Sequence, residues 1–102
     1  MITSAYDRKE AFALRVVCTE DALSVDLADG RTIVVPLDWF PRLANGTSVE
    51  RSNWRLIGSG EGIQWPDLDE DISVESLLAG RRSKETQESL KRWLQKRHMA
   101  AR

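Results

Sequence analysis

The sequence has few of the residues on which most catalytic and metal sites depend. Of its 102 residues, one is a cysteine, Cys18, and one is a histidine, His98. A single cysteine excludes an internal disulfide and a cluster of thiolate ligands, and it is typical of a protein in a reducing compartment. Because His98 is distant in sequence, we interpret Cys18 as a small buried apolar side chain and not as a nucleophile. We therefore expect no catalytic residue, no metal and no cofactor.

Long hydrophobic runs are also missing. The longest are short, such as TIVVPL, and none approaches the ~20 residues that a membrane-spanning helix needs. The first twelve residues, MITSAYDRKEAF, carry charges where a signal peptide has an apolar core. We expect a cytoplasmic protein that does not contact a membrane.

Phosphate-binding glycine motifs are absent as well. The stretch GSGEGIQW has glycines at alternate positions, but it does not match G-x-G-x-x-G and does not open a helix. Glycines in this pattern favour a backbone turn between two strands, for which no nucleotide is needed.

The composition that remains is typical of one globular domain. It is 41% hydrophobic and 30% charged, and the net charge is only −1. That value conceals an asymmetry along the chain. Residues 1–80, here called the acidic body, carry fourteen acids and seven bases, whereas residues 81–102, the basic tail, carry eight bases and two acids.

Alternating apolar residues predict an antiparallel sheet. ALRVVCTE, from Ala13 to Glu20, is β-branched and reads as a strand. In ALSVDLADGRTIVVPL the alternation stops at Asp29-Gly30 and resumes, which predicts a β-hairpin whose second strand ends near Pro36. Two shorter strands, residues 54–57 and 63–65, are predicted on either side of the glycine-rich stretch.

Capping signals predict the helices. Thr47 and Glu50 have the spacing of a capping box, which indicates a short helix over residues 48–53. Asp71 or Ser73 caps a further short helix that ends at Gly80, and residues 83–98 form the last, amphipathic helix. The predicted class is α+β, with an N-terminal segment (1–12), an α+β core (13–80) and a basic C-terminal helix (81–102) that packs on the core or on a partner.

The acidic run in GIQWPDLDEDIS raises the question of a cation site. Carboxylates stand at alternate positions, as in an EF-hand loop, but the sixth position from Asp67 is Ile72 where that loop needs glycine, and the twelfth is Leu78 where it needs glutamate. We interpret the run as a solvent-facing turn that caps a helix. An enzyme that uses Asp67, Asp69 or Asp71 for acid-base chemistry is the least favoured alternative.

Aromatic residues are concentrated at a few points. The four tryptophans, Trp39, Trp54, Trp65 and Trp93, are interpreted first as core residues. WFPRL, residues 39–42 with the following leucine, also has the composition of an interface anchor.

The basic tail has three interpretations. It forms a solvated helix that docks through Leu90, Trp93 and Leu94, or it binds a partner through the same apolar stripe, or it binds nucleic-acid phosphates. The first two are compatible. The cations available to a nucleic acid are Arg81, Arg82, Lys84, Lys91, Arg92, Lys96 and Arg97.

Three segments resemble a catalogued family of small bacterial proteins. LSVDLADGRTIVVPLDWFPRL, SVERSNW and GEGIQWPDLDEDISVESLLAGR, within about residues 13–81, are similar to domain of unknown function 2442. Members often have histidine before the tryptophan, where this chain has Gln64. The resemblance implies a small α+β fold, to which some relatives append a helix-turn-helix domain. Members are frequently encoded beside small toxin-like proteins, which implies an antitoxin or toxin-partner role.

These observations favour a non-enzymatic bacterial binding module, antitoxin-like, whose partner is a small basic toxin-like protein. An acidic surface would steer such a partner and raise its association rate. The alternative is a nucleic-acid-associated regulator that uses the basic tail. A homodimer through a strand edge or through the stripe on the last helix is a further expectation. The predicted partner-binding residues are Trp39, Phe40, Pro41, Arg42, Trp65, Asp67, Asp69, Glu70 and Asp71.

Overall fold

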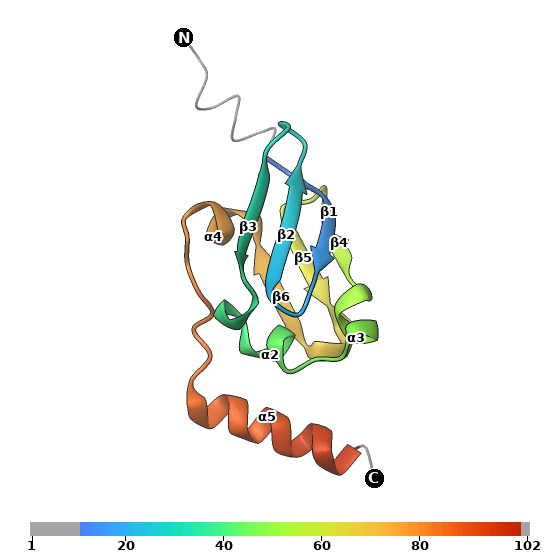
Figure 1. Cartoon of the computed structure of the whole chain (residues 1–102), viewed down its shortest axis with the longest axis vertical. Helices are drawn as coiled ribbons and strands as arrows, with labels where there is room; N and C mark the ends of the chain where they lie inside the picture. Colours follow the sequence, from blue (N-terminus) through green and yellow to red (C-terminus); the bar gives the residue numbers. More distant parts are fainter. Residues whose placement is uncertain (1–10, 101–102) are drawn as a thin grey trace.

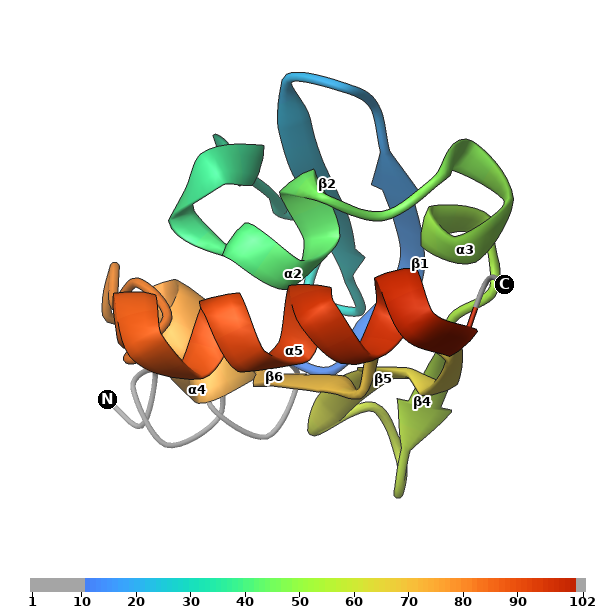
Figure 2. The same ribbon diagram turned by 90° about the horizontal axis from the view of Figure 1, so that it is seen from below.

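Two three-stranded antiparallel sheets pack face to face and enclose the core, as Figures 1 and 2 show from two directions. The computed structural model describes residues 11–100. Sheet A contains β1 (Ala13–Cys18), β2 (Ala22–Leu27) and β3 (Thr32–Pro36) in that order. Sheet B contains β4 (Arg55–Ile57), β5 (Gly62–Trp65) and β6 (Glu70–Ser73) in that order. The predicted α+β class is confirmed.

Sheet A follows the predicted alternation. Leu23, Val25 and Leu27 of β2 are buried, and the intervening residues face outward. The hairpin to β3 turns at Gly30, whose φ of 96° is a left-handed conformation that favours glycine. Before it, the Asp29 carboxylate accepts a hydrogen bond from the Arg31 backbone N–H at 3.0 Å. The predicted hairpin and its end at Pro36 are confirmed.

Sheet B contains a strand that the sequence did not predict. After β5, the 3₁₀ helix η2 (Pro66–Leu68) and Asp69, with φ of 53°, reverse the chain, and β6 pairs with β5 from Trp65↔Glu70 to Gly62↔Ser73. The interpretation of the acidic run as a helix-capping turn is therefore wrong for Glu70 and Asp71, which belong to a strand. Ser73 does cap the next helix, since its Oγ accepts from the Ser76 N–H at 3.0 Å.

The helices are short except for the last. They are the 3₁₀ helix η1 (Leu37–Trp39), α2 (Pro41–Ala44), α3 (Ser48–Ser52), α4 (Val74–Leu78) and α5 (Gln87–Ala100). The capping box of α3 is confirmed, because Thr47 and Glu50 exchange side-chain and backbone hydrogen bonds at 3.1 and 2.9 Å. Helix α5 begins at Gln87 and not at the predicted Ser83, because Thr86 caps it: the Thr86 hydroxyl accepts a hydrogen bond from the Ser89 N–H at 3.0 Å. The Ser83 N–H donates to the Trp39 carbonyl at 3.0 Å.

The core lies between the two sheets and the short helices. Trp65 is its largest fully buried side chain, and its indole N–H donates to the Arg51 carbonyl at 3.1 Å. Trp39, Trp54 and Trp93 pack against the core while partly exposed. Within the described residues, no helix is long and apolar enough to span a membrane.

Helix α5 lies across the end of the two sheets, beneath α2 and α3 (Figures 1 and 2). Its Trp93 ring is flanked by two guanidinium groups, Arg42 at 5.3 Å and Arg97 at 4.7 Å from the ring centroid. Arg97 also reaches both carboxylate oxygens of Glu50, at 2.8 and 3.1 Å. Docking of α5 therefore depends on ion pairs and cation–π contacts around one aromatic ring.

Candidate partner-binding surface

The carboxylates of the acidic run point to different parts of the molecule. Asp67 accepts a hydrogen bond from the Asn53 side chain at 2.8 Å, and Asp69 forms an ion pair with Arg42 at 3.3 Å. Asp71 is exposed on the outer face of sheet B, because its neighbour Ile72 faces the core. The run therefore does not form a single acidic cluster.

Glu70 is the partly buried member of the run, whereas Asp67, Asp69 and Asp71 are exposed. Burial raises the pKa of its carboxyl group to about 7. The Arg42 guanidinium lowers the pKa of Glu70, whereas the carboxylates of Glu85, Asp71 and Asp69 raise it further. Glu70 therefore exchanges a proton near neutral pH, and its charge changes where most carboxylates stay ionised.

A shallow hollow of about 410 Å³ lies on the outer face of sheet B. We call it the sheet B hollow. Gly62 pairs with Ile57 and Ser73 in the outer row of the sheet, and the Ile57 side chain lies over it, since a Cβ at Gly62 would be 3.3 Å from Ile57 Cδ1. Both charged residues among those that line it, Glu61 and Asp71, are acidic. The described residues that line it are Ile57, Glu61, Gly62, Asp71, Ile72, Ser73 and Ser76.

A second depression of about 240 Å³ lies along β6, on the side of the 81–84 segment. Glu70 and Asp71 line it together with Arg81, Arg82 and Lys84, so its charges are of both signs. Arg82 is also stacked on Trp39, at 5.1 Å from the ring centroid. Because its charges are mixed, this depression does not favour a partner of either charge.

The residues of the predicted anchor WFPRL make contacts within the molecule. Phe40 and Trp65 are buried, so in this structure they support the surface from beneath. Arg42 binds Glu85 through two hydrogen bonds, at 2.5 and 3.0 Å, and also reaches the Asp69 carbonyl at 2.9 Å. The Arg42 guanidinium holds the pKa of the Glu85 carboxyl below its usual range. Of the group, Trp39, Pro41 and Arg42 are partly exposed.

The basic tail divides into engaged and exposed cations. Arg97 is bound to Glu50, whose pKa is lowered mainly by that hydrogen bond, and Arg82 is stacked on Trp39. Arg81, Lys84, Lys91, Arg92 and Lys96 are exposed.

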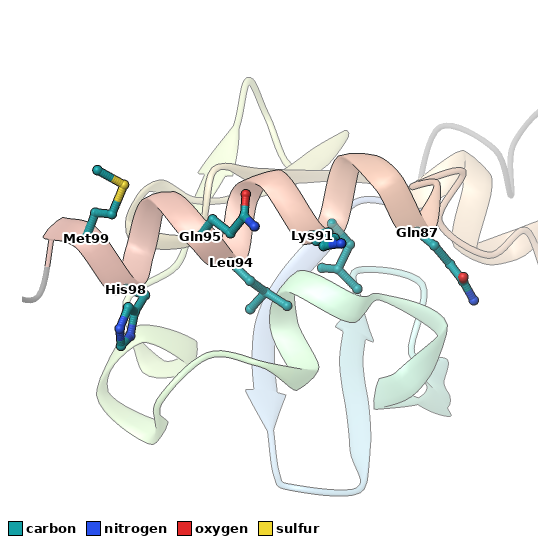
Figure 3. A pocket seen from close by; sticks show the side chains of 7 residues that line it. Gln87, Lys91, Leu94, Gln95, His98 and Met99 are labelled. Carbon is teal, nitrogen blue, oxygen red and sulfur yellow. The ribbon is translucent and has the colours of Figure 1, made fainter.

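One side of α5 presents an apolar hollow to solvent, and Figure 3 shows the side chains that line it. Leu90 and Leu94 give it apolar character, Met99 extends it, and Lys91 and His98 stand beside them. The stripe predicted from Leu90, Trp93 and Leu94 is therefore split, because Trp93 packs on the body while Leu94 is exposed.

Cys18 has the properties expected of an unreactive thiol. Burial raises its pKa to about 11, and the nearby Arg51 offsets only part of the increase. The protonated thiol is a poor nucleophile at neutral pH. Across residues 11–100, no three His, Cys, Asp or Glu side chains come together in a group that could hold a metal ion.

Sequence reasoning missed most of the sheet B hollow. It selected Asp71 but not Ile57, Glu61, Gly62 or Ser73, because these residues meet only through the β4–β5–β6 register. The nearest signal was Gly62, which directly precedes the predicted strand 63–65, since a glycine in a strand can mark a close approach of another backbone or a ligand.

Comparison with known proteins identifies relatives of unknown function. A family model described as "Protein of unknown function (DUF2442)" matches residues 13–83. A crystal structure of a protein of unknown function from Rhodospirillum rubrum is similar with a TM-score of 0.63 and 25% identity, over 79% of this chain and 98% of that one. A solution structure of an uncharacterised protein from Chromobacterium violaceum gives a TM-score of 0.65 and 24% identity, over 81% and 78% of the two chains. Among curated proteins, none matches the chain.

Proposed function

The chain belongs to the DUF2442 family, and we propose that it acts as a non-enzymatic binding module, antitoxin-like, for a small basic toxin-like protein. The observation that carries the proposal is the sheet B hollow. An apolar side chain of the partner packs against the exposed Ile57, and basic side chains around it meet Glu61 and Asp71. An apolar centre within a charged rim is the usual organisation of a protein interface.

The charge distribution supports the same partner. The acidic body has a net charge of −7, so its field attracts a basic protein from a distance. The hollow is on the outer face of sheet B, and its own lining is acidic among the described residues, although it shares Asp71, Ile72, Ser73 and Ser76 with the depression that Arg81, Arg82 and Lys84 line. Complementary charge of this kind raises the association rate and makes it fall with added salt.

The proposal is tested by co-expression with the product of the gene that neighbours this chain's own. The full chain should co-purify with that protein and restore growth when the protein is toxic. Glu61→Lys and Asp71→Lys together should lower the affinity by about tenfold or more, since each places a like charge against the partner. Asp38→Lys is the matched control, because Asp38 is an exposed acid outside the hollow. Absence of a complex and of growth rescue with the unmodified chain would contradict the proposal.

A nucleic-acid-associated regulator is the second candidate. It is favoured by the five exposed cations Arg81, Lys84, Lys91, Arg92 and Lys96. If they contact phosphates, the logarithm of the binding constant should fall linearly with the logarithm of salt concentration, and each cation removed should reduce the slope by about one. Lys91→Gln, Arg92→Gln and Lys96→Gln, measured on the full chain with duplex DNA and with single-stranded RNA, provide that test. Binding that is insensitive to salt would exclude this candidate.

A further inference from the structure

We propose that the open face of sheet A is a self-association surface, through which two copies of the chain pair about a two-fold axis. This association is separate from the proposed function, since it uses the opposite sheet. Among the described residues no helix lies over this face, which is turned toward the viewer in Figure 1.

The middle row of the face has an exposed valine on each outer strand and a serine on the central strand. Val17 of β1 pairs with Ser24 of β2, and Ser24 pairs with Val34 of β3. Val17 is 48% exposed and Val34 is 62% exposed, which is high for β-branched side chains within a sheet. Ser24 has a smaller side chain than the two valines, so the surface dips at the centre of the row, and a valine from a second copy can approach it there.

The rows of side chains on either side of this middle row carry no net charge. On one side, Arg15 and Asp26 form an ion pair at 3.2 Å, and the Thr32 hydroxyl donates to the same Asp26 carboxylate at 2.8 Å. On the other side, Ala22 pairs with Pro36. A β-bulge between Ala13 and Arg15 places Leu14, which is 59% exposed, next to Arg15 at the start of β1.

Charge separates this face from the other exposed apolar sites. Ile57 lies beside Glu61 and Asp71 in the sheet B hollow, and Leu78 lies beside Glu61 and Glu75. Leu94 lies beside Lys91 on α5. Two copies that met through any of these sites would bring like charges together, at a cost in free energy.

The sheet A face, by contrast, is self-complementary. An isologous two-fold interface places the same patch on both sides, so it needs a surface that can face itself. Arg15 and Asp26 supply one charge of each sign, and a rotated copy can offer the opposite charge to each. A second copy of this chain is therefore the occupant that best fits the face.

The size of the face sets the strength of the association. Three strands of about five residues cover roughly 17 Å by 14 Å, given a rise of ~3.3 Å per residue and a strand spacing of ~4.8 Å. That area is well below the ~800 Å² per partner of a standard stable interface. The dimer should therefore be weak, with a dissociation constant between about 10 µM and about 1 mM.

Sedimentation equilibrium of the full chain, from about 10 µM to about 1 mM, measures this association directly. The unmodified chain should change from monomer to dimer over that range. Val34→Glu should raise the dissociation constant by about tenfold or more, because it buries a charge between the two copies. Val49→Glu is the matched control, since Val49 is an exposed valine on α3, outside this face, and it should leave the constant within about twofold.

A dilution series of amide NMR spectra tests the location without any substitution. Concentration-dependent shifts confined to β1, β2 and β3 support the proposal even if Val34→Glu does not fold. A chain that stays monomeric up to about 1 mM overturns the proposal. The occupant of the face would then be residues 1–10 or another protein. Shifts confined to α5 or to sheet B, or a dimer lost in Val49→Glu but retained in Val34→Glu, also overturn it.

Discussion

Replacement of Glu70 by glutamine should stabilise the protein in a pH-dependent way. The pKa of Glu70 rises from 4.5 to about 7 on folding, so the folded state binds this proton more tightly than the unfolded state. Stability is therefore lost as the pH rises from about 4.5 through about 7, where the folded protein must ionise a buried carboxyl. Above that range, Glu70→Gln removes the whole free-energy cost of ionising Glu70 in the folded protein. At pH 4.5 that cost is small, so the substitution changes the stability little.

The magnitude follows from the size of the pKa change. A change from 4.5 to about 7 corresponds to about 3 kcal/mol. Because part of the side chain is in contact with water, screening reduces the expected gain at pH 8 to about 1–2 kcal/mol. For a chain of 102 residues this is an increase in Tm of about 5–10 °C.

Thermal unfolding followed by circular dichroism at pH 4.5 and pH 8 is the appropriate assay. Asp38→Asn is the control, because Asp38 is an exposed acid that is not among the groups that shift the Glu70 pKa. The charged groups that shift the Glu70 pKa are Arg42, Glu85, Asp71 and Asp69, and they are the same in the parent and in Glu70→Gln. A lower Tm for Glu70→Gln at pH 8, or an equal increase at both pH values, would refute the assignment of the cost to a buried carboxylate.

Three further predictions concern the scaffold. Thr47→Ala should cost about 1 kcal/mol in chemical denaturation because it breaks the capping box of α3, whereas Ser48→Ala should be nearly neutral. Gly60→Ala should lower the denaturation midpoint further than Gly30→Ala: both glycines have positive φ, but only at Gly60 would a Cβ meet a backbone oxygen, at 2.5 Å. Trp93→Ala should release α5, seen as faster hydrogen exchange over residues 87–100 with the exchange of the two sheets unchanged.

Local signals explain why sheet A and α3 were predictable. The hairpin combines strict alternation with Asp29-Gly30, and the α3 capping box lies entirely within four residues, so no distant contact is needed to recognise either. Strand β6 was missed for the opposite reason. Glu70 and Asp71 have poor strand propensity, and the segment becomes a strand because Asp69 turns the chain and β5 supplies a pairing edge.

The candidate surface was less predictable than the fold. The sequence groups the carboxylates of residues 67–71, but the alternation of a strand sends Glu70 and Asp71 to opposite faces. Arg42 was selected as an interface anchor, and the structure commits it to Glu85, which is forty-three residues away. Such a partner cannot be identified before the fold is known. The partner-binding role itself stays a prediction.

The order of the strands has a consequence for how fast the protein folds. Every pair of neighbouring strands is also consecutive in the sequence, β1–β2–β3 and then β4–β5–β6. Each pairing therefore closes only a short loop, and the loss of chain entropy is small at every step. The two meanders then meet mainly through side chains such as Val25 and Ile63. We expect the slow step of folding to be the docking of two preformed sheets, so that core substitutions at their junction retard folding more than substitutions in the hairpin turns.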